Sequence, residues 1–155
     1  MTKINKSYHN ALQIMLNGLM TRYKQRVPDV DTIINAMIQH NIISNEHDII
    51  NDHIAFRTFG LPHLGIQSLE KIMLAYGYSK KDFYRFETKK LTAYWYSPPS
   101  NIPNLPRLFI SQCEINQLSK KAQAIINHYT QHITKDPVDT LDLKDGNAVD
   151  TFLHT

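Results

Sequence analysis

Apolar residues recur at spacings of three and four along the N-terminal part of the chain, a pattern typical of amphipathic helices. One apolar stripe ends before Pro28 and another begins after Asp29, so we expect a pair of helices within residues 1–43. The first stripe consists of Leu12, Met15, Leu16, Leu19 and Tyr23, and the second of Val30, Ile33, Ile34, Met37 and Ile38.

The period changes from helical spacing to strict alternation in the segment 51–59, which predicts a β-strand. Alternation divides its side chains between the two surfaces of a sheet. One surface receives His53, Ala55 and Arg57, and the other receives Ile54, Phe56 and Thr58. An imidazole and a guanidinium separated by a single methyl group are unusual on one strand surface, and the small Ala55 leaves room above the sheet.

The downstream pattern predicts one helix and three further strands. Residues 60–65 suggest a loop, the apolar face of a short helix follows, and aromatic residues favour strands over 82–88 and 91–97. A proline-rich loop then leads to a strand over 107–112, and Ser119 is placed to cap a helix. We expect one α+β domain over 1–155, with a strand-helix-three-strand module at 48–113, a C-terminal helix at 114–134 and a loop or tail at 135–155.

Two side chains of the alternating strand are the first candidates for chemistry. At a rise of ~3.3 Å per residue, His53 and Arg57 lie roughly 13 Å apart along the backbone, and their side chains can converge on one small molecule. An imidazole is a common metal ligand, and a guanidinium binds a carboxylate through two parallel hydrogen bonds. The pair therefore predicts a site for a small acid beside a metal.

Composition narrows the class of protein. The 155 residues are 42% hydrophobic and 20% charged, which is normal for a globular domain, and a net charge of +3 does not require a nucleic-acid partner. The single cysteine, Cys113, excludes an internal disulfide and fits a reducing compartment. The sequence has neither an apolar run long enough for a membrane span nor a signal-like start, so we expect a cytoplasmic protein without membrane attachment.

The segment Asn51–Phe59, followed downstream by Leu105–Ser111, resembles the 2-oxoadipate dioxygenase/decarboxylase family, also called hydroxyglutarate synthases. The element order is similar to the module of vicinal-oxygen-chelate folds. The resemblance implies an iron(II)-dependent, oxygen-consuming conversion of 2-oxoadipate to 2-hydroxyglutarate in lysine breakdown. It assigns His53 as an iron ligand and Arg57 as the residue that holds the carboxylate of a small 2-oxo dicarboxylic acid.

The chain departs from the family in its ligand set. Family members are longer, and their second histidine and glutamate ligands lie in a later part of the fold. By resemblance this chain corresponds to the N-terminal part, so the remaining iron ligands are expected outside it. Gln112 and Cys113 also stand where the family has an acidic and then an aliphatic residue. We expect the 155-residue chain alone to be inactive.

Other interpretations stay open beside this one. A truncated, catalytically inactive module that self-associates, for example as a homodimer, is the main alternative. The hairpin Lys80–Lys90 interleaves basic and aromatic residues as a nucleic-acid surface does, although a hairpin with charged turns is the favoured interpretation. Four further residues have no assigned role: His63 in the loop after the strand, His128 and His132 on the last helix, and Cys113.

Overall fold

The computed structural model describes residues 6–154. Their contacts divide them into two compact units. Residues 52–141 form the sheet unit, and residues 6–51 together with 142–154 form the helical unit. Each unit is described by itself.

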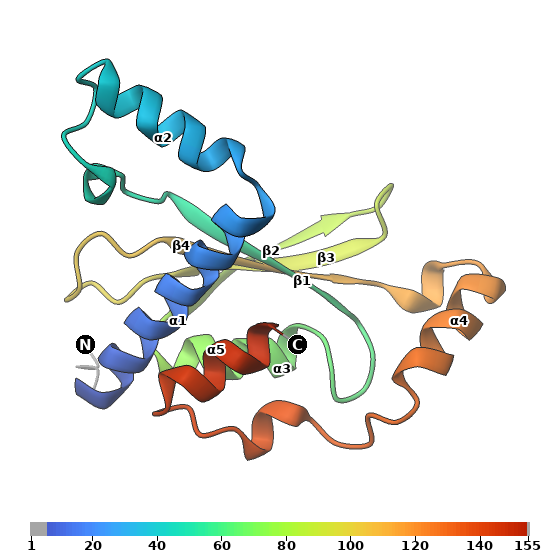
Figure 1. Cartoon of the computed structure of the whole chain (residues 1–155). Helices are drawn as coiled ribbons and strands as arrows, with labels where there is room; N and C mark the ends of the chain where they lie inside the picture. Colours follow the sequence, from blue (N-terminus) through green and yellow to red (C-terminus); the bar gives the residue numbers. More distant parts are fainter. Residues whose placement is uncertain (1–5, 155) are drawn as a thin grey trace. The chain divides into compact units, whose positions relative to one another are not determined.

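The helical unit contains the predicted N-terminal pair, α1 (Lys6–Arg26) and α2 (Asp29–Gln39), and a third helix, α5 (Gly146–His154) (Figure 1). The expectation of a loop or tail over 135–155 is therefore wrong for most of that segment. The Asp145 carboxylate caps α5 by accepting hydrogen bonds from the backbone N–H groups of Asn147 and Ala148. Helix α5 packs on α1, where Arg22 donates two hydrogen bonds, of 2.8 and 2.5 Å, to Asp150.

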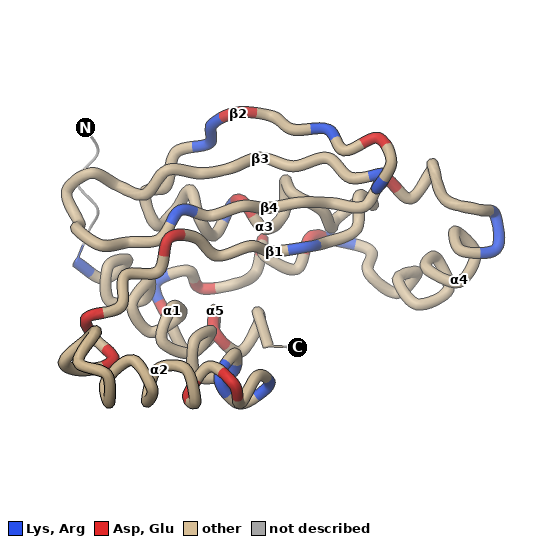
Figure 2. The backbone as a smooth tube through the Cα atoms, turned by 90° about the horizontal axis from the view of Figure 1, so that it is seen from above, with Lys and Arg blue, Asp and Glu red and all other residues tan. Residues whose placement is uncertain are grey.

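The sheet unit has the predicted order of one strand, one helix and three strands. These are β1 (His53–Phe59), α3 (Ile66–Ala75), β2 (Ser79–Phe86), β3 (Leu91–Ser97) and β4 (Arg107–Cys113). The four strands lie side by side in the order β1-β4-β3-β2 (Figure 2). β1 pairs with β4 in parallel, whereas β4 with β3 and β3 with β2 are antiparallel. The fold is thus α+β, as expected.

Helix α3 covers one face of the sheet (Figure 1). Ile72 and Met73 of the helix are fully buried, as are Leu108 and Ile110 of β4 on the covered face. The Tyr96 hydroxyl on β3 donates a 2.6 Å hydrogen bond to Glu70 on α3, and its burial together with Glu70 raises its pKa. No helix of residues 52–141 lies over the opposite face, which is turned toward the viewer in Figure 2. We call this opposite surface the open face.

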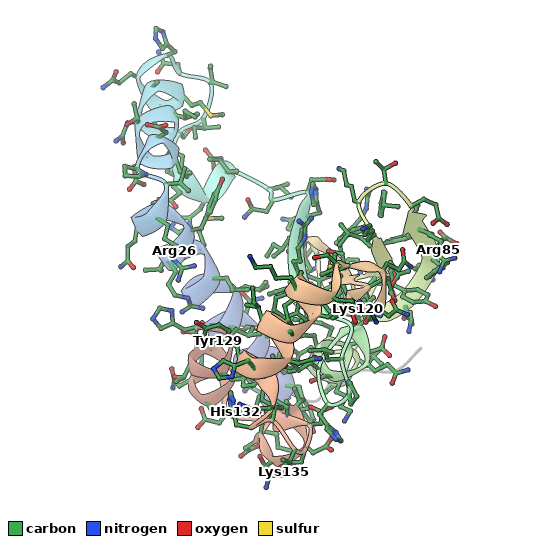
Figure 3. All side chains as sticks on the ribbon, turned by 90° about the vertical axis from the view of Figure 1, so that its right-hand side faces the viewer. Arg26, Arg85, Lys120, Tyr129, His132 and Lys135 are labelled. Carbon is green, nitrogen blue, oxygen red and sulfur yellow. The ribbon has the colours of Figure 1, made fainter. Side chains whose placement is uncertain are left out.

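The chain after β4 continues through the short turn Ile115–Gln117, helix α4 (Lys120–Thr130) and the turn Pro137–Thr140. Ser119 caps α4 as predicted, because its hydroxyl accepts a hydrogen bond from the Ala122 N–H. Helix α4 has no buried residue, and Tyr129 is 73% exposed. Tyr129 projects from the helix together with Lys120 and, beyond its end, His132 and Lys135 (Figure 3).

A cluster of polar side chains fixes the turn Pro137–Thr140 to α3. Asp136 accepts hydrogen bonds of 2.7 Å from both Ser68 and Lys71 and one of 2.9 Å from the Val138 N–H. Lys71 also pairs with Asp139. Burial alone would raise the pKa of Asp136, but these hydrogen bonds outweigh burial and lower it below its ordinary value.

Replacing Asp136 by Asn tests this cluster, because the stability that the cluster contributes depends on pH. Since the folded pKa is lowered, the stabilisation is present above the ordinary value of 3.8 and is lost as the pH falls through the lower folded value. We expect Asp136→Asn to lower the free energy of unfolding by about 1–2 kcal/mol at pH 7. The deficit should shrink at acidic pH in urea titrations followed by Trp95 fluorescence. The control Asp139→Asn should lower the free energy of unfolding by at most about 0.5 kcal/mol. If Asp136→Asn lowered it equally at pH 7 and at acidic pH, the assignment would be contradicted.

The close approach of α5 to α1 gives a second prediction. A Cβ atom on Gly146 would lie 2.8 Å from the Ala11 Cα, a backbone atom that cannot move aside cheaply. We expect Gly146→Ala to destabilise the helical unit by about 1–3 kcal/mol, although alanine is the better helix former. Urea unfolding followed by far-ultraviolet circular dichroism measures the effect. The exposed neighbour Asn147→Ala is the control, and a stabilised Gly146→Ala variant would refute the packing.

Candidate functional site

β1 places His53 and Arg57 on the open face, as the alternation predicts. His53, Ala55 and Arg57 are all exposed, and Ile54 and Phe56 between them are partly buried. The parallel register with β4 then fixes the neighbour of each residue. Arg107 lies opposite His53, Phe109 opposite Ala55, and Ser111 opposite Arg57.

Aromatic rings cover the part of the open face next to β1. Phe109 contacts Tyr84 and Phe86 of β2, with ring centroids 5.9 and 6.5 Å apart, and Tyr84 and Phe86 stack on each other at 6.4 Å. Tyr84 and Phe86 remain 41% and 37% exposed, which is high for rings in a cluster. The open face therefore combines an apolar aromatic surface with basic side chains at its edge.

A hollow of about 580 Å³ lies between these rings and β1. Its polar lining residues are Arg57, Lys89 and Ser111. Its apolar lining residues are Ala55, Phe56, Phe86, Leu91 and Phe109. The Ser111 hydroxyl is already engaged, because it donates a 3.3 Å hydrogen bond to the Phe56 carbonyl oxygen. The two cations are therefore the polar groups of the hollow that are free to meet a ligand.

His53 lies on the same face but outside the residues that line the hollow. Its Nδ1 is 3.0 Å from an Asp52 carboxylate oxygen, and the other Asp52 oxygen is 3.7 Å from Arg107 Nη1. A histidine held at Nδ1 by a carboxylate presents Nε2 outward, the arrangement common among metal-binding histidines. With a side chain 61% exposed, His53 is accessible to a ligand.

The described residues do not by themselves fit an iron site. Within residues 6–154 no three His, Cys, Asp or Glu side chains gather closely enough to hold a metal ion. His53 supplies one suitable donor, and a facial iron site needs three. His63, in the loop after β1, does not line the hollow, and His128 and His132 are exposed on or beyond α4.

Sequence reasoning missed several residues of the site. Phe86, Phe109 and Ser111 join it only through strand pairing, and Lys89 was assigned to the basic hairpin. The alternation along 107–113 carried a usable signal, since Arg107, Phe109 and Ser111 share a face by period alone. Two other cations of the hairpin have acidic partners: Lys80 pairs with Glu70 at 2.8 Å, and Arg85 with Glu87 at 3.6 Å.

A second hollow, of about 400 Å³, lies on the α3 side of the sheet. It is lined by the 60–67 segment and by residues that include Lys80, Tyr94 and Gln112. Lys80 is engaged there by Glu70 and by the Tyr94 ring, 3.9 Å from its centroid. Gln112 bonds the Ile66 N–H at 3.0 Å and so fixes the start of α3. The hollow on the open face is the better candidate site, because its cations have no such partners.

Comparison with known proteins gives the family. The family model for 2-oxoadipate dioxygenase/decarboxylase matches residues 15–155. This chain belongs to the 2-oxoadipate dioxygenase/decarboxylase family. The chloroplastic 2-oxoadipate dioxygenase/decarboxylase of Arabidopsis thaliana is 35% identical over 126 residues, which are 76% of this chain and 33% of that protein. The chain thus spans about a third of the length of the curated relatives it matches.

Solved structures show the same fold. The hydroxyglutarate synthase of Oryza sativa in complex with 2-oxoadipate matches with a TM-score of 0.72 and 33% identity, over 82% of this chain and 42% of that one. A protein of Ralstonia eutropha described as belonging to the glyoxalase superfamily matches with a TM-score of 0.60 and 16% identity, over 85% of this chain and 45% of that one. The expected likeness to vicinal-oxygen-chelate folds is therefore confirmed at the level of architecture.

Among the described residues of this family member, no helix has both the length and the apolar character needed to cross a membrane.

Proposed function

We propose that this chain forms the substrate-anchoring part of a non-haem iron(II)-dependent 2-oxoadipate dioxygenase/decarboxylase, which produces 2-hydroxyglutarate in lysine breakdown. The observation that carries the proposal is the joint exposure of His53 and Arg57 on the open face, with Arg57 lining an apolar hollow. Family membership supports the reaction class, and the rice relative, solved with 2-oxoadipate, supports the ligand class.

The spacing along β1 suits a six-carbon diacid. The Cα atoms of His53 and Arg57 are separated by four residues, or ~13 Å. Five carbon–carbon bonds of ~1.5 Å give an extended diacid a span of about 6 Å between its end carbons. The remaining distance accommodates the two side chains and their contacts. Arg57 would thus hold the distal carboxylate while the 2-oxo end lies beside His53.

Iron(II), when bound, would supply open coordination positions for a 2-oxo acid and dioxygen. This chain contributes His53, oriented by Asp52, and the other ligands come from outside the described residues. The role of residues 52–141 is to bind the diacid, orient it along β1 and keep its methylene chain against apolar side chains. We expect no turnover by this chain on its own. We place the protein in the cytoplasm, for which the single cysteine is the supporting observation.

The open face also favours a second candidate function, a self-associating module without chemistry. Tyr84 and Phe86 expose apolar rings on an uncovered sheet surface, which is the kind of patch that pairs proteins. Analytical ultracentrifugation separates the candidates. A dimer that dissociates on Phe86→Asp and has no affinity for 2-oxoadipate would favour the module.

Arg57 gives the first functional prediction. Arg57→Ala should weaken 2-oxoadipate binding by about ten- to hundredfold, because one charge-assisted carboxylate contact is worth about 1.5–3 kcal/mol. The full chain can be titrated by NMR in the presence of a chelator, so that metal plays no part. Arg26→Ala, at the exposed end of α1, is the matched control and should change nothing. Unaltered binding by Arg57→Ala would remove the anchoring role.

His53 gives the second functional prediction. Anaerobic titration of the chain with iron(II) should show weak binding, since one imidazole without its companion ligands cannot hold the ion tightly. His53→Ala should abolish that binding, and the control His128→Ala, on exposed α4, should retain it. Identical curves for the parent chain and His53→Ala would show that this imidazole is not a ligand position.

A further inference from the structure

Two cations line the hollow of the open face without an acidic partner. Within residues 6–154 neither Arg57 nor Lys89 has a carboxylate oxygen within 4.0 Å, whereas Arg85 and Arg107 each have one. The lining contains no acidic side chain at all among the described residues. Two positive charges that face one partly apolar space give a local excess of positive charge, which a bound anion would neutralise.

We infer that Lys89 is a specificity-determining residue, and that it and Arg57 together hold the distal carboxylate of a linear dicarboxylic acid. This inference rests on the proposed function of the same site and goes beyond it, since it assigns a second cation to the carboxylate. Arg57 supplies a planar pair of donors, and Lys89 supplies a point charge on a flexible four-carbon stem.

The turn that carries Lys89 is held in place by the backbone. The Lys89 and Lys90 N–H groups donate 3.1 Å hydrogen bonds to the carbonyl oxygens of Phe86 and Glu87, which closes the turn between β2 and β3. The Lys90 carbonyl oxygen accepts a 2.8 Å bond from the Glu114 N–H, just beyond β4. The turn is thus tied to the strand next to β1, and the backbone of Lys89 has a defined position beside the hollow.

The walls of the hollow select the rest of the ligand. Phe86, Leu91 and Phe109 offer carbon surface in the same hollow as the two cations. A chain of methylene groups gains about 0.8 kcal/mol for each group that it buries there, whereas a second polar group in the middle would lose its hydration. The chemistry therefore fits a charged end followed by an unbranched hydrocarbon chain.

The test uses the full chain, a chelator and two probes of equal length, adipate and its neutral diamide, titrated by NMR. We expect adipate to bind and to shift the Ala55 and Ser111 amide signals, and the diamide to bind far more weakly. Lys89→Ala should weaken adipate binding about fivefold, the equivalent of one exposed ion pair, and leave diamide binding unchanged. Lys89→Arg should retain adipate affinity, and the control Lys81→Ala, an exposed lysine of β2, should match the parent chain.

The outcomes separate this inference from the function on which it rests. Adipate binding that needs Arg57 but is the same in Lys89→Ala would overturn the role of Lys89 and leave the proposed function standing. Adipate binding that is lost in neither variant, or is absent in the parent chain, would overturn both. If Lys89→Ala lost affinity equally for adipate and for the diamide, the substitution would have disturbed the structure of the turn, and this result would also overturn the inference.

Discussion

The parallel pairing of β1 with β4 is the interaction on which the site depends. It fixes which residues of the two strands stand side by side, and a slip of one residue would turn every side chain of β1 to the other face. In the observed register Ala55 lies beside Phe109 and Arg57 beside Ser111, so a small residue and a buried hydroxyl make room next to the guanidinium. Helix α3, which covers the opposite face, makes the alternative register costly because the partly buried Ile54 and Phe56 of β1 would turn away from it.

Only one face of the sheet is covered by α3, which explains why Arg57 and Lys89 on the open face remain available to a ligand. On the α3 side, polar groups are satisfied internally, as Tyr96 and Lys80 are by Glu70. On the open face Phe86 and Phe109 line the hollow together with Arg57 without offering it an anion. A guanidinium that has no acidic partner in the protein can pair with an incoming carboxylate. The arrangement is therefore suited to binding an acid, and contributes little to the stability of the fold.

The sequence predicted the features that depend on local periodicity. The spacing of apolar residues predicted the strand with His53 and Arg57, the order of the module and the N-terminal helices. A single capping residue, Ser119, predicted the start of α4. Lys89 and the aromatic lining could not be predicted in the same way, because they join the site through the pairing of strands distant in the sequence. Helix α5 was missed because it is short and begins at Gly146, a poor helix former that is accommodated there by close packing on Ala11.

In the proposed function, anchoring of the substrate and chemistry at the metal are separable. Every residue that lines the hollow belongs to residues 52–141, which form a compact unit with its own core. For the proposed metal, by contrast, the described residues gather no three His, Cys, Asp or Glu side chains, and the chain spans about a third of its curated relatives. A carboxylate anchor requires only two cations and an apolar wall, all of which one sheet can provide, whereas three converging ligands require side chains from elements that meet across a cavity. Under the proposed function, affinity for the diacid would therefore reside in this module, whereas turnover would require ligands from outside the described residues.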